Sequence, residues 1–367
     1  MSEKYTSLGL MSGTSGDGVD ASIINSDGVN KFETIKDKYY EYDSNIYKDF
    51  HFLKDRIFNI HDLKKLSKEV NGLERKITLF HAKIIKELSI NKEETLIGFH
   101  GQTIYHNAME KISRQLGDGK LLYQLTKRKI IYNFRENDIL NGGEGAPLTP
   151  IFHKLIATQK KMNLPTCILN IGGISNVTIV DLDELFSKDI GPGNCLIDTW
   201  VRKNSKKKFD HNGYLASIGK KNEIIFEQAQ ELYYNRNKEK KSFDTNDFDI
   251  SFSRGLSLED GTTTLTEFTG SIIAEAISLL AKNGKMFSNI IICGGGRKNK
   301  MLINIIQKNL SQKIKIMMID DYGIDGDFVE SKAFAFLAIR SYKKLPITFP
   351  STTNCKKPCT GGEIIEN

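Results

Sequence analysis

Two stretches of this chain share one pattern: an apolar run, a glycine-containing turn, and a second run in which apolar and polar residues alternate. The first is "SLGLMSGTSGDGVDASIIN" (7–25), and the second is "TCILNIGGISNVTIVDL" (166–182). Such a pattern predicts a β-hairpin. Two hairpins of this kind in one chain predict two related halves, each of which opens with a hairpin.

The length and the order of the remaining segments agree with two domains. The chain has 367 residues, more than one ordinary hydrophobic core holds. Residues 94–106 predict a buried strand that leads into a polar loop, and 287–310 predict a strand, a glycine turn and a helix. Residues 264–282 and 330–344 predict helices, whereas the polar segment 201–262 predicts loops and short helices. Strands and helices alternate, so the predicted fold class is α/β.

Composition narrows the class of protein. Hydrophobic residues make up 39% of the chain and charged residues 26%, as in soluble globular proteins. No stretch approaches the ~18 apolar residues of a membrane span, and the first residues lack a signal-peptide pattern. We therefore expect a cytoplasmic protein with no membrane partner.

The net charge of +7 comes from lysines that are spread along the chain, with local runs at 202–208 and 237–241. No aromatic residues interleave the first run, so solvated loops are favoured over a nucleic-acid surface. The five cysteines are scattered and odd in number, which argues against a disulfide framework. We interpret Cys355 and Cys359 as free thiols.

The turn at residues 12–19 offers both backbone amides and carboxylates. Its glycines let amides approach a ligand closely, and clustered amides suit phosphate. Asp17 and Asp20 would repel a bare phosphate, but nucleotide phosphates arrive with Mg²⁺, which binds carboxylates and water. No lysine follows the glycines, so this is not a Walker A loop. The sequence predicts a phosphate cradle with Asp17 toward the metal's water shell; a plain hairpin turn is the alternative.

A second site combines an acid with rigid glycines. In "KDIGPGNCLIDTW" (188–200), Asp189 precedes a Gly-Pro-Gly turn that restricts the backbone. A carboxylate held beside such a turn can act as a general base. An Asx-type turn cap is about equally plausible from this pattern. Asp198, on the following helical stretch, is interpreted as structural.

A third group of polar residues suits a hydroxyl-rich ligand. "FHGQTIYH" contains His100, Gln102 and Thr103. The spacing of its two histidines is not a zinc pattern, so we interpret the stretch as a hydrogen-bonding wall. In "NFREND", Arg135 can pair either with a substrate carboxylate or with Asp138.

These motifs together resemble the anhydro-N-acetylmuramic acid kinase family, bacterial sugar kinases of peptidoglycan recycling. The matching stretches include "GLMSGTSGDGVDA", "HGQTIYH", "NFRENDILNGGEGAPLTP", "LNIGGISNVT", "DIGPGNCLIDTW", "CGGGRKN" and "ESKAFAFLAIR". They follow one another from residue 9 to about residue 340, so the resemblance covers nearly the whole chain. It implies the actin, Hsp70 and sugar-kinase fold, in which two RNase H-like α/β domains surround a nucleotide cleft. The expected domains are residues 1–133 plus 349–367 and residues 134–348.

The resemblance also implies a reaction. Water opens the 1,6-anhydro ring of anhydro-N-acetylmuramic acid while ATP phosphorylates O6, giving N-acetylmuramic acid 6-phosphate and ADP. Asp189 is the implied catalytic base, Mg²⁺ the implied metal, and a homodimer the implied assembly. The implied nucleotide-binding residues are Ser12, Gly13, Thr14, Ser15, Gly16, Asp17, Gly18, Val19, Gly172, Gly173, Gly294, Gly295, Gly296 and Asn299. The implied substrate-binding residues are His100, Gln102, Thr103, Arg135, Asp138, Asn170 and Glu330.

The chain departs from the family pattern at four positions. Gly16 replaces a bulkier apolar residue, Lys188 and Ile190 flank the implied base in place of an aromatic and a small residue, and Thr245 replaces an arginine. Lys188 could lower the pKa of Asp189 if its side chain points inward. These departures concern substrate contacts and remove no catalytic group.

Three other functions stay open. The chain could be a catalytically silent nucleotide-binding sensor of the same fold, or a kinase of a different sugar, since one fold hosts many substrates. A nucleic-acid binder would show steeply salt-dependent DNA binding.

Overall fold

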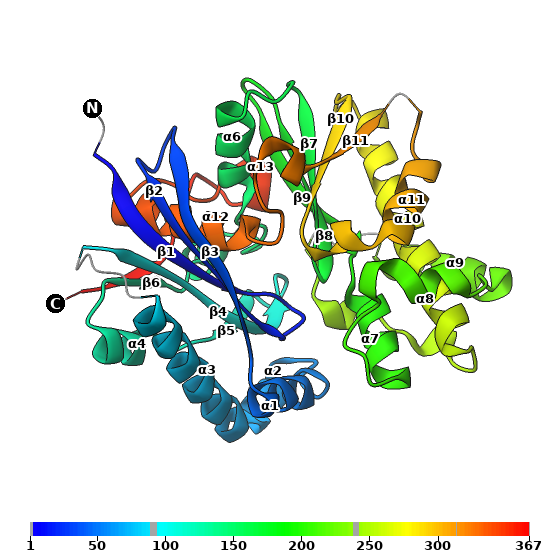
Figure 1. Ribbon diagram of the computed structural model, residues 1–367, viewed down its shortest axis with the longest axis horizontal. Helices are drawn as coiled ribbons and strands as arrows, with labels where there is room; N and C mark the ends of the chain where they lie inside the picture. The colour runs from blue at the N-terminus through cyan, green and yellow to red at the C-terminus, as the bar shows by residue number, and fades with distance from the viewer. Residues whose placement is uncertain (1–2, 89–93, 238–241, 313, 367) are drawn as a thin grey trace. The chain divides into compact units, whose positions relative to one another are not determined.

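The structure is a computed structural model that describes residues 3–88, 94–237, 242–312 and 314–366. The chain forms two compact units (Figure 1). Unit 1 comprises Met1–Met162 and Asp327–Asn367, and unit 2 comprises Asn163–Gly326. Unit 1 is thus built from both parts of the chain that flank unit 2.

Unit 1 contains a mixed sheet in the order β12-β6-β4-β1-β2-β3, with β5 paired to β4. Strands β1, β2 and β3 form an antiparallel meander, and β4 and β6 extend the sheet in parallel with β1. The strands are β1 (Tyr5–Ser12), β2 (Gly18–Ser26), β3 (Phe32–Glu41), β4 (Leu96–Asn107), β5 (Ile112–Leu116), β6 (Ile130–Tyr132) and β12 (Glu363–Ile365). The helices are α1 (Ser44–Lys54), α2 (Ile60–Lys65), α3 (Ser67–Glu87), α4 (Gly119–Thr126), α5 (Glu136–Leu140), α6 (Pro150–Gln159), α12 (Val329–Tyr342) and α13 (Pro350–Thr353).

Alternation along β1 explains how this sheet is covered. Leu8 and Leu10 are fully buried in a cluster with apolar residues of α1 and α3. Gly9 faces α12 instead, since a Cβ there would lie 1.9 Å from the carbonyl oxygen of Ser331. Only glycine lets the helix approach so closely.

Helix α12 is fixed to this sheet by polar contacts as well. The hydroxyls of Ser22 and Ser331 are 2.7 Å apart, and the buried Lys332 ammonium is 2.8 Å from the carboxylate of Asp37. Residues 327–348 accordingly belong to unit 1, and so do residues 134–162. The sequence predicted both ranges in the second domain.

Unit 2 contains a five-stranded sheet in the order β11-β10-β7-β8-β9. Its strands are β7 (Thr166–Ile171), β8 (Ile174–Val180), β9 (Leu185–Pro192), β10 (Asn289–Cys293) and β11 (Lys315–Met318). Its α-helices are α7 (Cys195–Asn204), α8 (Tyr214–Ile218), α9 (Glu223–Asn237), α10 (Leu258–Lys282) and α11 (Lys300–Asn309). Short 3-10 turns are η1 (His211–Gly213), η2 (Thr245–Asp247), η3 (Ser251–Ser253), η4 (Gly295–Lys298) and η5 (Ile319–Tyr322).

The two sheets repeat one topology. Strands β7, β8 and β9 form an antiparallel meander, and β10 and β11 continue the sheet in parallel with β7. Five strands of each unit follow the same order, β3-β2-β1-β4-β6 in unit 1 and β9-β8-β7-β10-β11 in unit 2, and in each set only the second strand of the meander is reversed. Unit 1 adds the antiparallel strands β5 and β12. The shared order is the RNase H-like arrangement, so the α/β fold and the internal repeat predicted from the two hairpins are confirmed.

Helix α10 is long and apolar enough to cross a membrane by length and composition alone. In the structure most of its apolar residues are buried in unit 2, where Leu265 and Phe268 pack with α7 and Ile273 and Ile277 pack under the sheet. A core helix of a globular unit passes the same test.

One predicted element is wrong in its extent. Residues 94–106 predict a buried strand that leads into a polar loop, but β4 runs from Leu96 to Asn107 without a loop, because β5 pairs with its second half. The pairing of β4 with β1 shifts between Leu10 and Met11, where Phe99 and Gly101 are the respective partners. The polar residues of this stretch therefore belong to a paired strand.

Candidate active site

The turn between β1 and β2 is fixed in one conformation by backbone and side-chain bonds. Gly16 N donates to Gly13 O at 3.1 Å, which closes the turn, and Gln102 Nε2 donates to the same oxygen at 2.7 Å. At the other end, Asp17 O accepts bonds from Tyr42 N at 2.9 Å and from the Tyr39 hydroxyl at 3.0 Å. The predicted phosphate cradle is therefore a preorganised turn.

Asp17 lies in this turn with a partly exposed side chain. Its Oδ1 accepts a bond from Ser15 Oγ at 2.7 Å, which orients the carboxylate. Carboxylate oxygen is a hard donor of the kind that Mg²⁺ or its bound water prefers. The donor chemistry of the turn thus fits a magnesium ion.

Gly13 and Gly16 have different surroundings. A Cβ on Gly13 would meet only Ser15 Oγ, at 3.6 Å, so the space beside its backbone is open. Gly16 has a φ of +63°, and a Cβ there would lie 2.1 Å from the ring of Phe50. Phe50 fills the space beside this position, which explains how the chain accommodates glycine where the family has a bulkier residue.

The structure brings three of the predicted substrate-binding residues together in unit 1. His100 Nδ1 donates to Gly101 O at 2.8 Å, and Arg135 Nη2 donates to His100 Nε2 at 2.9 Å. Burial, and then the charge of Arg135, keep the pKa of His100 well below its usual value, so the ring is neutral. Burial raises the pKa of Glu330, and the Arg135 charge opposes that shift.

The other three predicted substrate residues of unit 1 have different partners. Gln102 is buried against the phosphate cradle, and its Oε1 has no hydrogen-bond donor within the described residues. Thr103 Oγ1 accepts a bond from Gln115 Nε2 at 3.2 Å. Asp138 is buried and accepts bonds from Gly145 N and Thr353 Oγ1. The alternative ion pair between Arg135 and Asp138 does not form, because Arg135 Nη1 donates to Gly145 O instead.

In unit 2, three glycine-containing strand ends meet at one edge of the sheet. Asn194 N donates to Gly172 O at 2.8 Å, and Gly193 N donates to Gly173 O at 2.9 Å. Asn170, at the end of β7, is the register partner of Cys293, at the end of β10. The predicted residues Asn170, Gly172 and Gly173 therefore lie beside the turn that follows β10.

That turn contains glycines with opposite tolerances. Gly294 has a φ of +81°, and a Cβ there would lie 2.5 Å from Asn170 Oδ1. A Cβ on Gly295 would meet nothing nearer than Asn194 Nδ2, at 4.0 Å, so its environment is open. Arg297 fixes the turn, since its Nε is 2.8 Å from Asp320 Oδ2 and its Nη1 is 3.1 Å from Gly294 O.

Asn299 ends the same turn and begins α11. Its side-chain oxygen accepts a bond from Leu302 N at 3.0 Å, which caps the helix. The residue is 7% exposed, and the same oxygen lies 2.3 Å from where a Cβ on Gly213 would be. Asn299 therefore joins the glycine turn to η1.

Asp189 is a buried carboxylate on β9, with 5% of its surface exposed. Its Oδ2 accepts bonds from Phe243 N at 3.1 Å and from Ser242 Oγ at 3.2 Å. These donors lie 53 and 54 residues further along the chain. Lys188 is exposed, on the opposite face of β9, so the hypothesis that it points toward Asp189 is wrong.

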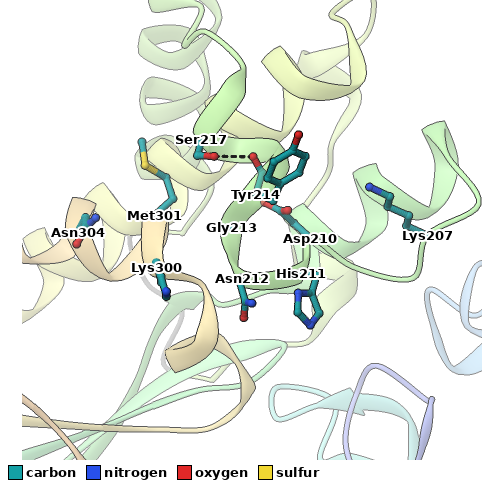
Figure 2. A pocket seen from close by; sticks show the side chains of 10 residues that line it. All are labelled: Lys207, Asp210, His211, Asn212, Gly213, Tyr214, Ser217, Lys300, Met301 and Asn304. Carbon is teal, nitrogen blue, oxygen red and sulfur yellow. Dashed lines mark hydrogen bonds between the residues drawn. The ribbon is translucent and has the colours of Figure 1, made fainter.

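A cavity of about 580 Å³ lies in unit 2 next to the glycine turn of β10. Figure 2 shows that its walls come from η1 and the residues around it and from the start of α11. Asp210 is committed to the fold, because its carboxylate accepts bonds from Leu215 N and Ala216 N. The lining residues are Lys207, Asp210, His211, Asn212, Gly213, Tyr214, Ser217, Lys300, Met301 and Asn304.

Comparison with known proteins decides the family. The model of the family described as anhydro-N-acetylmuramic acid kinase matches residues 5–367. The chain belongs to the anhydro-N-acetylmuramic acid kinase family. It is 54% identical over 375 residues to the anhydro-N-acetylmuramic acid kinase of Pelagibacter ubique (strain HTCC1062), with 100% of each chain covered. It is 33% identical over 374 residues to that of Agrobacterium fabrum (strain C58 / ATCC 33970), again with 100% of each covered.

Among solved structures, the chain is similar to component A of the (R)-2-hydroxyglutaryl-CoA dehydratase of Acidaminococcus fermentans. The sequence identity is 12% and the TM-score is 0.45, with 92% of this chain and 99% of the other covered. This likeness is too low to bear on the reaction.

Family membership confirms the predicted enzyme class, an anhydro-N-acetylmuramic acid kinase. A kinase of this family takes a nucleotide and a small sugar as substrates. The silent sensor and the kinase of a different sugar, which the sequence left open, are not favoured.

The hydrogen bonds of Asp189 with Ser242 and Phe243 were not predicted from the sequence. The only signal was that the stretch 241–249 resembles a family motif, and that signal says nothing of which residue it touches. The residues of η1 were also missed, because they fall in the polar segment interpreted as loops and short helices.

Proposed function

We propose that this member of the family uses ATP and water to convert 1,6-anhydro-N-acetylmuramic acid into N-acetylmuramic acid 6-phosphate and ADP. The observation that carries this proposal is Asp189, a buried carboxylate held by Ser242 and Phe243 beside the Gly-Pro-Gly turn. Ring opening by water needs such a base. A simple kinase, which transfers phosphate to a free hydroxyl, needs no group that activates water at the anomeric carbon.

Asp189 takes a proton from the water that attacks the anomeric carbon. The bond from this carbon to O6 breaks, and O6 bonds to the γ-phosphorus as the bond to ADP breaks. Charge that builds on O6 is thereby passed to the phosphate. A positioned base of this kind contributes about 10²–10⁴ in rate. The two hydrogen bonds to Oδ2 orient the carboxylate toward the proposed attacking water.

The turn Ser12–Val19 is proposed to bind the phosphates through its backbone amides. The open space beside Gly13 admits a phosphate oxygen, and the bonds from Gln102 and Tyr42 hold the turn ready. Asp17 would hold a water of Mg²⁺, which neutralises phosphate charge when bound. Preorganised amides cost no rearrangement at the moment of transfer.

The cavity beside η4 is proposed to bind the adenosine half of ATP. It lies between η1 and the start of α11, and offers apolar surface from Tyr214 and Met301 with polar atoms of Asn212 and Asn304. A nucleoside needs this mixture of a flat apolar wall and a few hydrogen-bonding groups. The turn that precedes α11 follows the carboxyl end of β10, which is parallel to β7, and ligands of α/β sheets gather at such strand ends.

The cluster of His100, Arg135 and Glu330 is proposed to bind the sugar. Arg135 offers a guanidinium to the carboxylate of the sugar's lactyl group, and Glu330 can accept a bond from a hydroxyl. His100 is neutral and orients Arg135. Asp138 contributes indirectly, because it holds the backbone of the turn that contains Gly145.

The test is an ADP-release assay of the full chain with ATP and Mg²⁺, with and without 1,6-anhydro-N-acetylmuramic acid. We expect release that depends on the anhydro-sugar and a product that carries both the phosphate and one oxygen from ¹⁸O-water at C1. N-acetylmuramic acid, which has no 1,6-anhydro bridge, should be a poor substitute for the anhydro-sugar. Equal turnover with N-acetylmuramic acid, or no ¹⁸O in the product, would refute the proposal.

The proposed site of action is the cytoplasm, where ATP is available. The homodimer implied by the family resemblance stays a prediction.

A further inference from the structure

The last part of unit 1 brings two thiols and a carboxylate into one buried cluster. The Sγ atoms of Cys355 and Cys359 and a carboxylate oxygen of Asp138 all lie within 4.8 Å of one another. Cys355 and Cys359 follow α13, while Asp138 lies on α5, more than two hundred residues earlier in the chain. The residues are 2%, 3% and 1% exposed, respectively. The proposed kinase reaction gives no role to either thiol.

Asp138 is a charged group in an environment that calls for a cation. Its two oxygens accept bonds from Gly145 N at 2.8 Å and from Thr353 Oγ1 at 2.7 Å, which hold the carboxylate in place. Each carboxylate oxygen keeps a second lone pair. Asp138 belongs to no ion pair in the described part of the chain. Buried charges in proteins are usually paired or bound to a metal.

We propose that Asp138, Cys355 and Cys359 form a binding site for a thiophilic divalent metal ion, for which Zn²⁺ is the best fit. Two thiolates and one carboxylate are ligands of tetrahedral zinc sites, whereas Mg²⁺ and Ca²⁺ take oxygen ligands only. The fourth ligand is the carbonyl oxygen of Lys357 or a water. Cys359 Sγ lies 3.0 Å from that carbonyl oxygen, so the oxygen borders the cluster.

Metal binding balances as a proton exchange. Each thiol loses its proton as the metal–sulfur bond forms, so one Zn²⁺ releases two protons to solvent. Burial and the neighbouring thiol raise the pKa of Cys359 to about 11, so the metal-free thiol is protonated at neutral pH. Its S–H is then free to donate to Lys357 O, the bond seen in the structure.

The proposed site ties the segment after α13 to α5. Lys356 N already donates to Asn141 O at 3.1 Å, and Glu144 N donates to Thr353 O at 2.8 Å. A metal ion would add a stronger link between the same two segments. Because the ion binds the folded chain, it raises the stability of unit 1 with concentration. The metal proposal does not rest on the kinase reaction, although Asp138 also holds the turn beside the proposed sugar site.

The experiment uses the full chain, purified with a reductant, freed of metal by a chelator, and dialysed against Zn²⁺. Elemental analysis should find one zinc per chain, and Co²⁺ in place of Zn²⁺ should give a thiolate-to-cobalt absorption band. C355S and C359S should each lose the band and weaken zinc binding at least tenfold, and D138N should weaken binding. C195S is the matched control, since Cys195 is a partly exposed thiol of unit 2, and it should bind like the wild type.

A second measurement needs only the wild-type chain, in case a variant fails to fold. Zn²⁺ should slow alkylation of Cys355 and Cys359 and leave the alkylation rate of Cys195 unchanged. The proposal would be overturned by no bound zinc in the wild type, or by C355S and C359S binding zinc as tightly as the wild type does. A disulfide between the two cysteines in freshly reduced protein, read as a mass two hydrogens lower, would also overturn it.

Discussion

The two units have one strand topology but differ in what their strand ends carry. In unit 1, the turn between the first two strands spans Gly13–Asp17 and includes a carboxylate; in unit 2, the corresponding turn is the pair Gly172–Gly173. The third strands also differ, but here the carboxylate belongs to unit 2 and not to unit 1. Strand β9 of unit 2 carries the buried Asp189, whereas β3 of unit 1 is mostly exposed along its length.

The difference shows how one scaffold supports two chemistries. The sheet fixes where the turns are, and the residues in the turns decide what each unit binds. Unit 1 has the acid beside the proposed phosphate cradle, and unit 2 has the acid proposed to activate water. Each of the following predictions separates the contribution of one unit from that of the other.

The largest effect is expected for Asp189 of unit 2. D189N keeps the size of the side chain but cannot take a proton, so kcat should fall by about 10²–10⁴. Binding of ATP and of the anhydro-sugar, measured by calorimetry, should change little. D198N is the control, because Asp198 lies on α7 and is not assigned to the reaction; it should cost far less. A dead D198N beside an active D189N would show that the base is the wrong aspartate.

The second effect concerns stability and belongs to unit 1. Burial lowers the pKa of His81 to about 4 and of His153 to about 3, and holds that of His100 well below the usual value. These rings are neutral when folded but bind protons when unfolded. Their contribution to stability is complete above an unfolded pKa of about 6.5 and declines as pH falls below it. From pH 6.5 to 5.5, we expect a loss of about 1 kcal/mol for each ring.

Urea unfolding at pH 7.5, 6.5 and 5.5 measures this loss. The decline should be smaller in H153Q than in the wild type, since one of the three rings is gone. H211Q is the control from unit 2, where His211 is exposed, and its pH dependence should match that of the wild type. If the free energy of unfolding of H153Q falls with pH as much as that of the wild type, His153 does not contribute to the pH dependence.

The turn of unit 1 contains Asp17, which is proposed to hold a water of Mg²⁺, and the corresponding turn of unit 2 contains no acid. D17N should raise the Mg²⁺ concentration for half-maximal activity by about 10- to 100-fold, the usual cost of losing a partner of a metal's bound ligand. The melting temperature should stay close to that of the wild type, because among the described residues the Asp17 side chain bonds only Ser15. D20N serves as the comparison. The metal-facing role moves to Asp20 if D20N, and not D17N, shifts the Mg²⁺ requirement.

The smallest effects come from a matched pair of glycines in each unit. G16A and G294A place a Cβ at positive φ against a neighbour, so each should lose about 1–2 kcal/mol or more of stability. G13A and G295A have room for the Cβ in the protein, so they should melt like the wild type. Their cost should fall on the ligand instead, as a several-fold rise in the KM for ATP with little change in the KM for sugar. A KM that does not move in either variant would place the nucleotide elsewhere.

The repeated hairpin was enough to predict the α/β class and the two related units, because strand and turn patterns are local. The unit to which a helix belongs is not local. Helix α12 was expected in the second domain, but its buried face fits β1, β2 and β4, and only the folded sheet shows the gap at Gly9 that receives it. The same limit explains why the end of β4 was interpreted as a loop.

The candidate site was likewise predictable only where its residues stand out locally in the sequence. Asp17, Asp189 and the glycine turns stand out by composition. The contacts of Phe50 with Gly16 and of Ser242 with Asp189 join segments far apart in the chain, and no spacing rule reveals them. Asn299 and Asp138 were assigned to ligands, yet the structure commits part of their hydrogen-bonding capacity to a helix cap and to a turn.

Unit 1 is built from two separate segments of the chain, so its parts are synthesised at different times. Unit 2 is one continuous segment, so it is complete when residue 326 leaves the ribosome. Unit 1 is not complete then, since α12, whose residues from Val329 to Ser341 are almost all buried, has yet to be made. Until it arrives, Gly9 and Gly98 leave a strip of sheet bare of side chains. This part of the sheet is therefore synthesised before the helix that covers it, and surface left uncovered during synthesis is prone to aggregate.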